Sequence, residues 1–115
     1  MTEEQIANVN KWVAALRSGK YQQGVGSLNR NEKYCCLGVL ADINNIPNEK
    51  IFGGTIVSYK FPIEIYNISP KTIPNEWWSV HTGLPHSLKS QLIHMNDTDI
   101  RPFADIANRI ESELS

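Results

Sequence analysis

Residues 33–42 read KYCCLGVLAD, and this stretch decides how the rest of the chain can fold. Its centre is apolar on all sides, and Asn44-Asn45 and Pro47 follow it as stop signals. The pattern predicts a compact, largely buried helix over residues 35–44. Cysteine is among the residue types most often found inside proteins, so both thiols are expected in the core.

A second, amphipathic helix is predicted over residues 3–18. Thr2 and Gln5 have the spacing of a capping box, and Gly19 is suited to the position just after a helix end. Apolar residues recur at helical spacing at Ile6, Val9, Val13 and Leu16, with Trp12 beside them.

Extended structure is expected between and after these helices. Residues 21–34 contain glycines and an Asn-Arg-Asn turn, which favours a hairpin or ordered loop. Residues 51–68 are rich in Ile, Val, Tyr and Phe, which predicts strand, with Pro62 at an edge or strand start. After Pro70 and Pro74, we expect a loop that carries the two tryptophans at positions 77 and 78.

Two further helices complete the expected fold. One starts at Leu84-Pro85 and ends near Asn96-Asp97, and the other begins at Pro102 and has an apolar stripe. The predicted fold class is therefore α+β, with about four helices around a small antiparallel sheet. With 115 residues, we expect residues 1–115 to form a single domain.

Charge and composition exclude several classes of protein. Eleven Lys and Arg against twelve Asp and Glu give a net charge of −1, which disfavours binding to duplex nucleic acid. The two cysteines are adjacent and cannot form the disulfide framework of a small secreted protein, so we expect the protein in the reducing cytoplasm. The sequence contains no apolar run of about 18 residues, so we expect no membrane-spanning segment. We expect a cytoplasmic protein that does not bind membranes.

Motifs for metal, cofactor or catalysis are not recognisable. The available soft ligands lack H-x-x-x-H or C-x-x-C spacing, and residues 95–99 lack the glycine and distal glutamate of a calcium loop. Phosphate-loop and dinucleotide fingerprints are absent as well. We expect no metal, no cofactor and no catalytic residue. Gly24-Val25-Gly26 could be a simple hairpin turn or a loop that cradles a ligand.

Polar residues directly after the first helix suggest a binding site. Arg17, Ser18, Lys20, Tyr21 and Gln23 cluster there, and the N–H groups at the start of the predicted helix at Cys35 could face them. Cations opposite a helix start would form a small-anion pocket, with an arginine from the C-terminal helices on the far wall. Alternatively, Arg17 pairs with an acidic neighbour such as Asp42 and only braces two helices.

Five short motifs extend over most of the chain, except residues 51–79. They are W-x-x-A-L-R-S-G-x-Y-x-Q at 12–23, C-C-L-G-V-L-x-D at 35–42, L-P-x-x-L at 84–88, L-x-x-M-N-D at 92–97 and F-A-x-I-A-x-x-I at 103–110. In this order they resemble small proteins found in tailed-phage genomes. The resemblance implies a phage or prophage origin, and such proteins often act on host defence.

The resemblance therefore implies a protein that sequesters a nucleotide-type immune signal, such as a cyclic nucleotide or an ADP-ribose derivative, and does so as a homo-oligomer in the infected cell. Alternatives are an inhibitor that binds a host defence protein, a structural phage role, or a small hydrolase. Trp77 or Trp78 could stack on a flat ligand or lie in an interface. The expected ligand-binding residues are Arg17, Ser18, Lys20, Tyr21, Gln22, Gln23, Cys36, Trp78, Asn96, Arg101 and Arg109.

Overall fold

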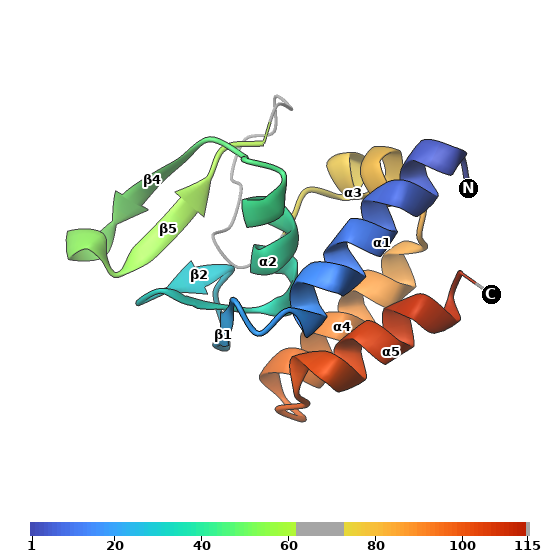
Figure 1. Ribbon diagram of the computed structural model, residues 1–115. Helices are drawn as coiled ribbons and strands as arrows, with labels where there is room; N and C mark the ends of the chain where they lie inside the picture. Colours follow the sequence, from blue (N-terminus) through green and yellow to red (C-terminus); the bar gives the residue numbers. More distant parts are fainter. Residues whose placement is uncertain (62–72, 115) are drawn as a thin grey trace.

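The computed structural model describes residues 1–61 and 73–114 and confirms an α+β fold (Figure 1). The helices are α1 Glu3–Arg17, α2 Cys36–Ile43, α3 Asn75–Thr82, α4 His86–Asp97 and α5 Phe103–Ser112, with a 3-10 helix at Phe52–Gly54. The strands are β1 Gln22–Gln23, β2 Asn29–Arg30, β3 Lys33–Tyr34, β4 Asn48–Ile51 and β5 Ile56–Tyr59. Four helices gather on one side, the strands lie on the other, and α2 stands between them (Figure 1).

The sheet is mixed, with the strand order β1-β3-β2-β5-β4. Strands β2 and β3 form the expected hairpin, and β4 and β5 form a second one. The first turn was expected at residues 29–31 but lies at residues 31–32, because Asn29 and Arg30 are paired in β2. The expectation of a purely antiparallel sheet is wrong at β1, which pairs parallel with β3. The reason is that the chain passes through the loop at residues 24–28 before it enters β2, so β1 reaches the outer edge of β3 in the same direction as β3.

Helix α1 confirms the first predicted helix and ends one residue earlier than expected. Thr2 and Gln5 form the complete capping box, and Ser18 is the C-cap. The buried face consists of Val9, Trp12, Val13 and Leu16, which pack against α2, α3 and α5. Ile6 was expected on this face, but it lies beyond the packed area and is 38% exposed.

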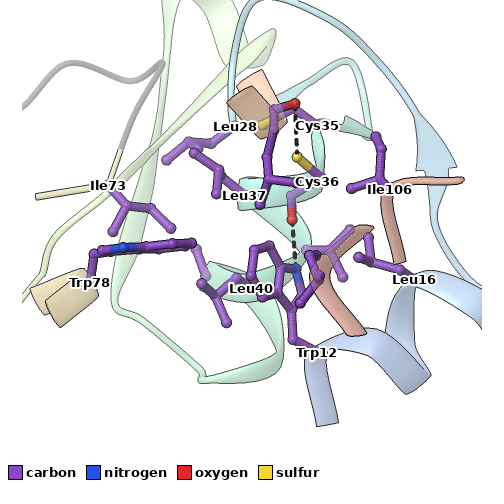
Figure 2. Close-up of a cluster of buried hydrophobic side chains, with 14 of the residues drawn as sticks. Trp12, Leu16, Leu28, Cys35, Cys36, Leu37, Leu40, Ile73, Trp78 and Ile106 are labelled. Atoms are coloured by element: carbon purple, nitrogen blue, oxygen red, sulfur yellow. Dashed lines mark hydrogen bonds between the residues drawn. The ribbon is translucent and has the colours of Figure 1, made fainter. Parts of the chain in front are cut away.

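Helix α2 is the centre of the core, and every residue from 36 to 41 is buried. Cys35 is its N-cap, and the Cys35 Sγ accepts a hydrogen bond from the Gly38 N–H. A Cβ at Gly38 would lie 1.7 Å from the Leu28 carbonyl oxygen, so glycine alone lets the preceding loop pass this close. The Trp12 indole N–H donates to the Cys36 carbonyl over 2.9 Å and ties α1 to α2 (Figure 2).

Helix α3 is a fifth helix where a loop was expected. It begins after Pro74 and ends at Gly83, which adopts the left-handed conformation with φ of 67°. Only Trp78 and Thr82 are buried on it, so its apolar stripe is too short to indicate a helix. The sequence signal for α3 was Pro74 directly before it and Gly83 directly after it, since proline is common at helix starts and glycine just past helix ends.

The two C-terminal helices confirm the remaining predictions. Leu88 and Leu92 are buried on α4, and Phe103, Ile106 and Ile110 are buried on α5. In the predicted strand region at 51–68, strand is confirmed at Ile51, the end of β4, and at Ile56–Tyr59 in β5, with the 3-10 helix Phe52–Gly54 between them. The expectations for Pro62 and Pro70 fall at residues 62–72, outside the described residues.

Candidate functional site

The residue expected at the centre of the anion pocket, Arg17, braces two helices. Its guanidinium donates to both carboxylate oxygens of Glu111, over 2.9 and 3.3 Å, and to the Asn108 side-chain oxygen over 2.8 Å. These contacts join the end of α1 to α5. Asp42, named as a possible partner of Arg17, instead accepts a 2.6 Å hydrogen bond from the Tyr21 hydroxyl.

The other polar residues after α1 do not converge with Arg17. The Ser18 hydroxyl donates to the Ala15 carbonyl and accepts from the Lys20 backbone N–H, so it completes the helix end. Lys20 and Gln22 are exposed. None of these residues lines any of the three hollows described below.

Three expected site residues, Gln23, Cys36 and Asn96, do meet, in a buried hydrogen-bond network. The Asn96 side-chain oxygen accepts from the Cys36 backbone N–H over 3.2 Å and from the Gln23 amide over 3.0 Å. The Asn96 amide donates to the Gly24 carbonyl and to Asp97. Asn96 is 0% exposed and has no bonding capacity left for a ligand, so this network holds α4 against α2 and the loop after β1.

Trp78, Arg101 and Arg109 also serve separate structural contacts. Trp78 is fully buried, crosses Trp12 edge to face at 5.7 Å, and donates to the Leu84 carbonyl. Arg101 lies 3.7 Å from Asp105, and Arg109 lies 2.7 Å from Glu113. The structure therefore does not gather the cations of α1 and α5 into one pocket.

The cysteines occupy the expected core positions. Cys35 is 5% exposed and Cys36 is 0% exposed, and the two do not bridge each other. Burial raises the pKa of the Cys35 thiol to about 12 and raises the pKa of Cys36 well above its ordinary value. Both groups are therefore protonated thiols near neutral pH, and thiols in that state are weak nucleophiles.

A different hollow, which we name the tyrosine pocket, lies on one face of the sheet beside α2. It has a volume of about 250 Å³. Its walls are Asn29, Asn31, Glu32, Tyr34, Asp42, Asn48, Lys50, Gly54, Thr55, Val57 and Tyr59. The strand register explains the gathering, because Asn29 pairs with Tyr34, Asn48 with Tyr59 and Lys50 with Val57, and paired residues share a face.

Asn29 is the least satisfied polar group of this pocket. It is 7% exposed, and its amide donates to the Tyr59 hydroxyl over 3.3 Å. Its side-chain oxygen is buried and has no hydrogen-bond partner among the described residues. Buried polar atoms of this kind are rare.

The tyrosines around Asn29 are neutral hydrogen-bonding groups. Burial raises the pKa of Tyr59 to about 12, and burial also raises the pKa of Tyr34. Burial and then the hydrogen bond to Asp42 raise the pKa of Tyr21. Tyr21 and Tyr34 contact edge to face at 4.9 Å, which fixes the Tyr34 ring. The pocket thus offers three amides, phenol hydroxyls, the carboxylates of Glu32 and Asp42 and the Lys50 ammonium group.

Sequence reasoning missed this pocket because its residues come from short strands that were predicted only as extended pieces. The available signal was the turn at Asn31-Glu32. A two-residue turn pairs Asn29 with Tyr34, so their side chains lie on one face of the hairpin. The contribution of Tyr59 could not be seen, because it depends on the register between β2 and β5.

A second hollow of about 320 Å³ lies between the start of α1 and α3. Trp77 and His81 line it together with Gln5 and Asn8. The Trp77 ring stacks on His81 at 4.4 Å and contacts Phe61, so its aromatic faces already have partners within the chain. Burial lowers the pKa of His81, which makes its ring neutral near pH 7.

The chain belongs to the family described as "Domain of unknown function (DUF8296)", whose model matches residues 3–114. No curated protein and no solved structure matches the chain. Among the described residues, no helix combines the length and the apolar character needed to cross a bilayer. No group of three or more His, Cys, Asp or Glu side chains in that part of the chain could hold a metal ion.

Proposed function

We propose that this protein binds a small nucleotide-type molecule in the tyrosine pocket and acts by sequestering it. The observation that carries the proposal is the buried side-chain oxygen of Asn29, which has no partner among residues 1–61 and 73–114 and lies in a pocket wall beside the Tyr59 hydroxyl. A ligand that donates a hydrogen bond would remove this deficit. Nucleobases have such donors, and flat rings pack well against tyrosine.

The lining chemistry supports binding without catalysis. Carboxylate, amide and hydroxyl groups can recognise the ring edge and the ribose hydroxyls, and the lining residues include no histidine or cysteine. We further propose, from the resemblance of the motifs to small tailed-phage proteins, that the sequestered molecule is an immune signal of the infected cell. The volume of about 250 Å³ fits one nucleoside unit and not a whole cyclic dinucleotide.

Calorimetry with nucleosides, cyclic dinucleotides and ADP-ribose cyclisation products tests the proposal. Two variants of β5 form a matched pair, because each removes one hydroxyl group. Tyr59→Phe removes a hydroxyl from the pocket, whereas Ser58→Ala removes one on the opposite face of the same strand. We expect Tyr59→Phe to weaken binding at least tenfold and Ser58→Ala to leave it unchanged.

Native mass spectrometry of protein purified from cells that produce immune nucleotides provides a second readout. It reports the retained ligand and the number of chains together, and so tests the expected homo-oligomer. If wild-type protein binds no member of the panel and retains no nucleotide, the proposal is refuted. A defence protein retained in place of a nucleotide would support direct inhibition.

A further inference from the structure

A third hollow lies on the other face of the β2–β3 hairpin, and we name it the cationic groove. It has a volume of about 360 Å³. Its lining residues are Gln23, Gly24, Val25, Arg30, Asn31 and Lys33. None of them is acidic, although the whole chain has slightly more acidic than basic residues.

Arg30 and Lys33 are the cations of this groove, and they lie opposite each other across the hairpin. Like charges at paired positions of a sheet repel each other and destabilise it. Both residues are exposed, and no ion pair among the described residues neutralises either of them. A bound anion would convert this repulsion into two attractive contacts, one of which can be the two-pronged contact of a guanidinium.

The glycine-rich loop forms the opposite wall. A Cβ at Gly24 would lie 2.7 Å from the Cβ of Lys33, so only glycine allows the loop to lie this close to the hairpin. The Gly24 N–H donates to the Tyr34 carbonyl. Val25 lines the groove, and its N–H donates to no acceptor among the described residues, so it is available to an anion.

Asn31 connects the cationic groove to the tyrosine pocket, because it lines both. It occupies the hairpin turn with a φ of 54°, and its N–H donates to the Thr55 carbonyl over 2.7 Å. A ligand that occupied both hollows would therefore have to pass Asn31 to reach Arg30 and Lys33.

We propose that the cationic groove binds a phosphate group, namely the phosphate of the nucleotide whose base lies in the tyrosine pocket. That this phosphate belongs to a nucleotide rests on the proposed function. The evidence for an anion site is independent of it and consists of the paired cations and the glycine-rich loop. The predicted ligand is thus a nucleotide and not a nucleoside or a neutral sugar.

Paired titrations test this assignment. Adenosine and guanosine are compared with AMP and GMP by calorimetry, and inorganic pyrophosphate is titrated alone while backbone amides are followed by NMR. We expect at least tenfold tighter binding of a nucleotide than of its nucleoside, which is about 1.4 kcal/mol. This gain should fall with added salt and disappear in Lys33→Gln and Arg30→Gln, whose side chains are exposed.

Lys11→Gln is the control, because it removes one positive charge from the exposed side of α1. An equal affinity for nucleoside and nucleotide, with no response of the groove amides to pyrophosphate, would overturn the inference and leave the proposed function standing. An equal loss of affinity in Lys11→Gln would overturn it as well. Pyrophosphate binding that Lys33→Gln abolishes, with no nucleoside bound and no nucleotide bound more tightly than pyrophosphate, would support the anion site and refute the proposed function.

Discussion

Single residues show most clearly how polar side chains divide between holding the fold and facing a ligand. Arg17 illustrates the first role. A helix end needs only Gly19 to stop, so the arginine before it suggested a binding site. In the structure the same arginine bridges α1 and α5 through Glu111. Its partner lies 94 positions away, which the local sequence could not indicate.

We predict that Arg17→Ala lowers the melting temperature slightly and leaves ligand affinity unchanged. The hydrogen bond from Arg17 lowers the pKa of Glu111. A carboxyl group with a lowered pKa in the folded state contributes stability above its unfolded pKa, and loses it as the pH falls through the folded value. The difference from wild type should therefore shrink in acid. Thermal melts near neutral pH and near pH 3 measure this difference in stability, with Lys11→Ala as the control. A tenfold loss of ligand affinity in Arg17→Ala at an unchanged melting temperature would contradict the prediction.

Asn96 shows the same distinction inside the core. It was expected to contact a ligand, yet its four hydrogen bonds all go to Gln23, Cys36, Gly24 and Asp97. We predict that Asn96→Ala destabilises the protein by roughly 2–5 kcal/mol, because two or more buried backbone and amide groups lose their partner. Urea unfolding measures the loss. Asn10→Ala, on an exposed position of α1, should stay within about 0.5 kcal/mol of wild type.

At the scale of elements, helix α2 depends on Gly38, a residue that helix propensity alone would replace with alanine. Alanine is better than glycine in a helix by about 1 kcal/mol. At position 38, however, a Cβ would lie 1.7 Å from the backbone oxygen of Leu28. Backbone atoms cannot move aside as a flexible side chain can, so the steric effect exceeds the gain in propensity.

We therefore predict that Gly38→Ala destabilises the protein by at least about 3 kcal/mol, in the range of severe packing defects. Denaturant unfolding followed by tryptophan fluorescence measures it. Ala14→Gly, at an exposed position of α1, makes the reverse exchange where sterics are absent, and should cost only about 1 kcal/mol. A stabilised Gly38→Ala protein would mean that the contact with Leu28 is not as close as the structure shows.

Elements with a long one-sided pattern were predictable from the sequence, and those defined by pairing were not. The stripes of α1 and α5 and the apolar run of α2 identify three helices, because each must bury its face. Helix α3 buries only two residues, and β1 is two residues long, so neither has a recognisable period. The tyrosine pocket depends on the register of Asn29, Tyr34 and Tyr59 across three strands. Register is a property of pairing, which a single segment does not reveal.

On the scale of the whole molecule, the tyrosine pocket lies where two parts of the fold meet. Tyr34 and Tyr59 come from the sheet, whereas Asp42 comes from the end of α2, the helix that stands between the sheet and the other helices (Figure 1). Ordering of the pocket is therefore coupled to the packing of the core. A ligand that bridges α2 and the sheet would raise the global stability and not only that of one hairpin.

The core makes the stability of the whole molecule sensitive to alkaline pH. The pKa values of the Cys35 thiol and the Tyr59 hydroxyl are about 12 in the folded protein, against ordinary values of 9.0 and 10.0. A raised folded pKa gives stability that is fully present below the unfolded pKa and is lost as the pH rises through the folded value. Because the unfolded chain releases each proton first, each group should cost about 1.4 kcal/mol per pH unit between its two values.

We accordingly predict that the urea midpoint is constant from about pH 7 to about pH 8.5 and falls steeply towards about pH 11. Tyr59→Phe removes one of the titrating protons, so its midpoint should fall less steeply above about pH 10 than that of the Ser58→Ala control.

The burial of the two cysteines predicts that a disulfide reagent near pH 8 labels Cys35 and Cys36 only when the protein opens, at a rate that follows unfolding. Rapid labelling of the folded protein would contradict the raised pKa of the thiols and would revive the alternative of a small hydrolase.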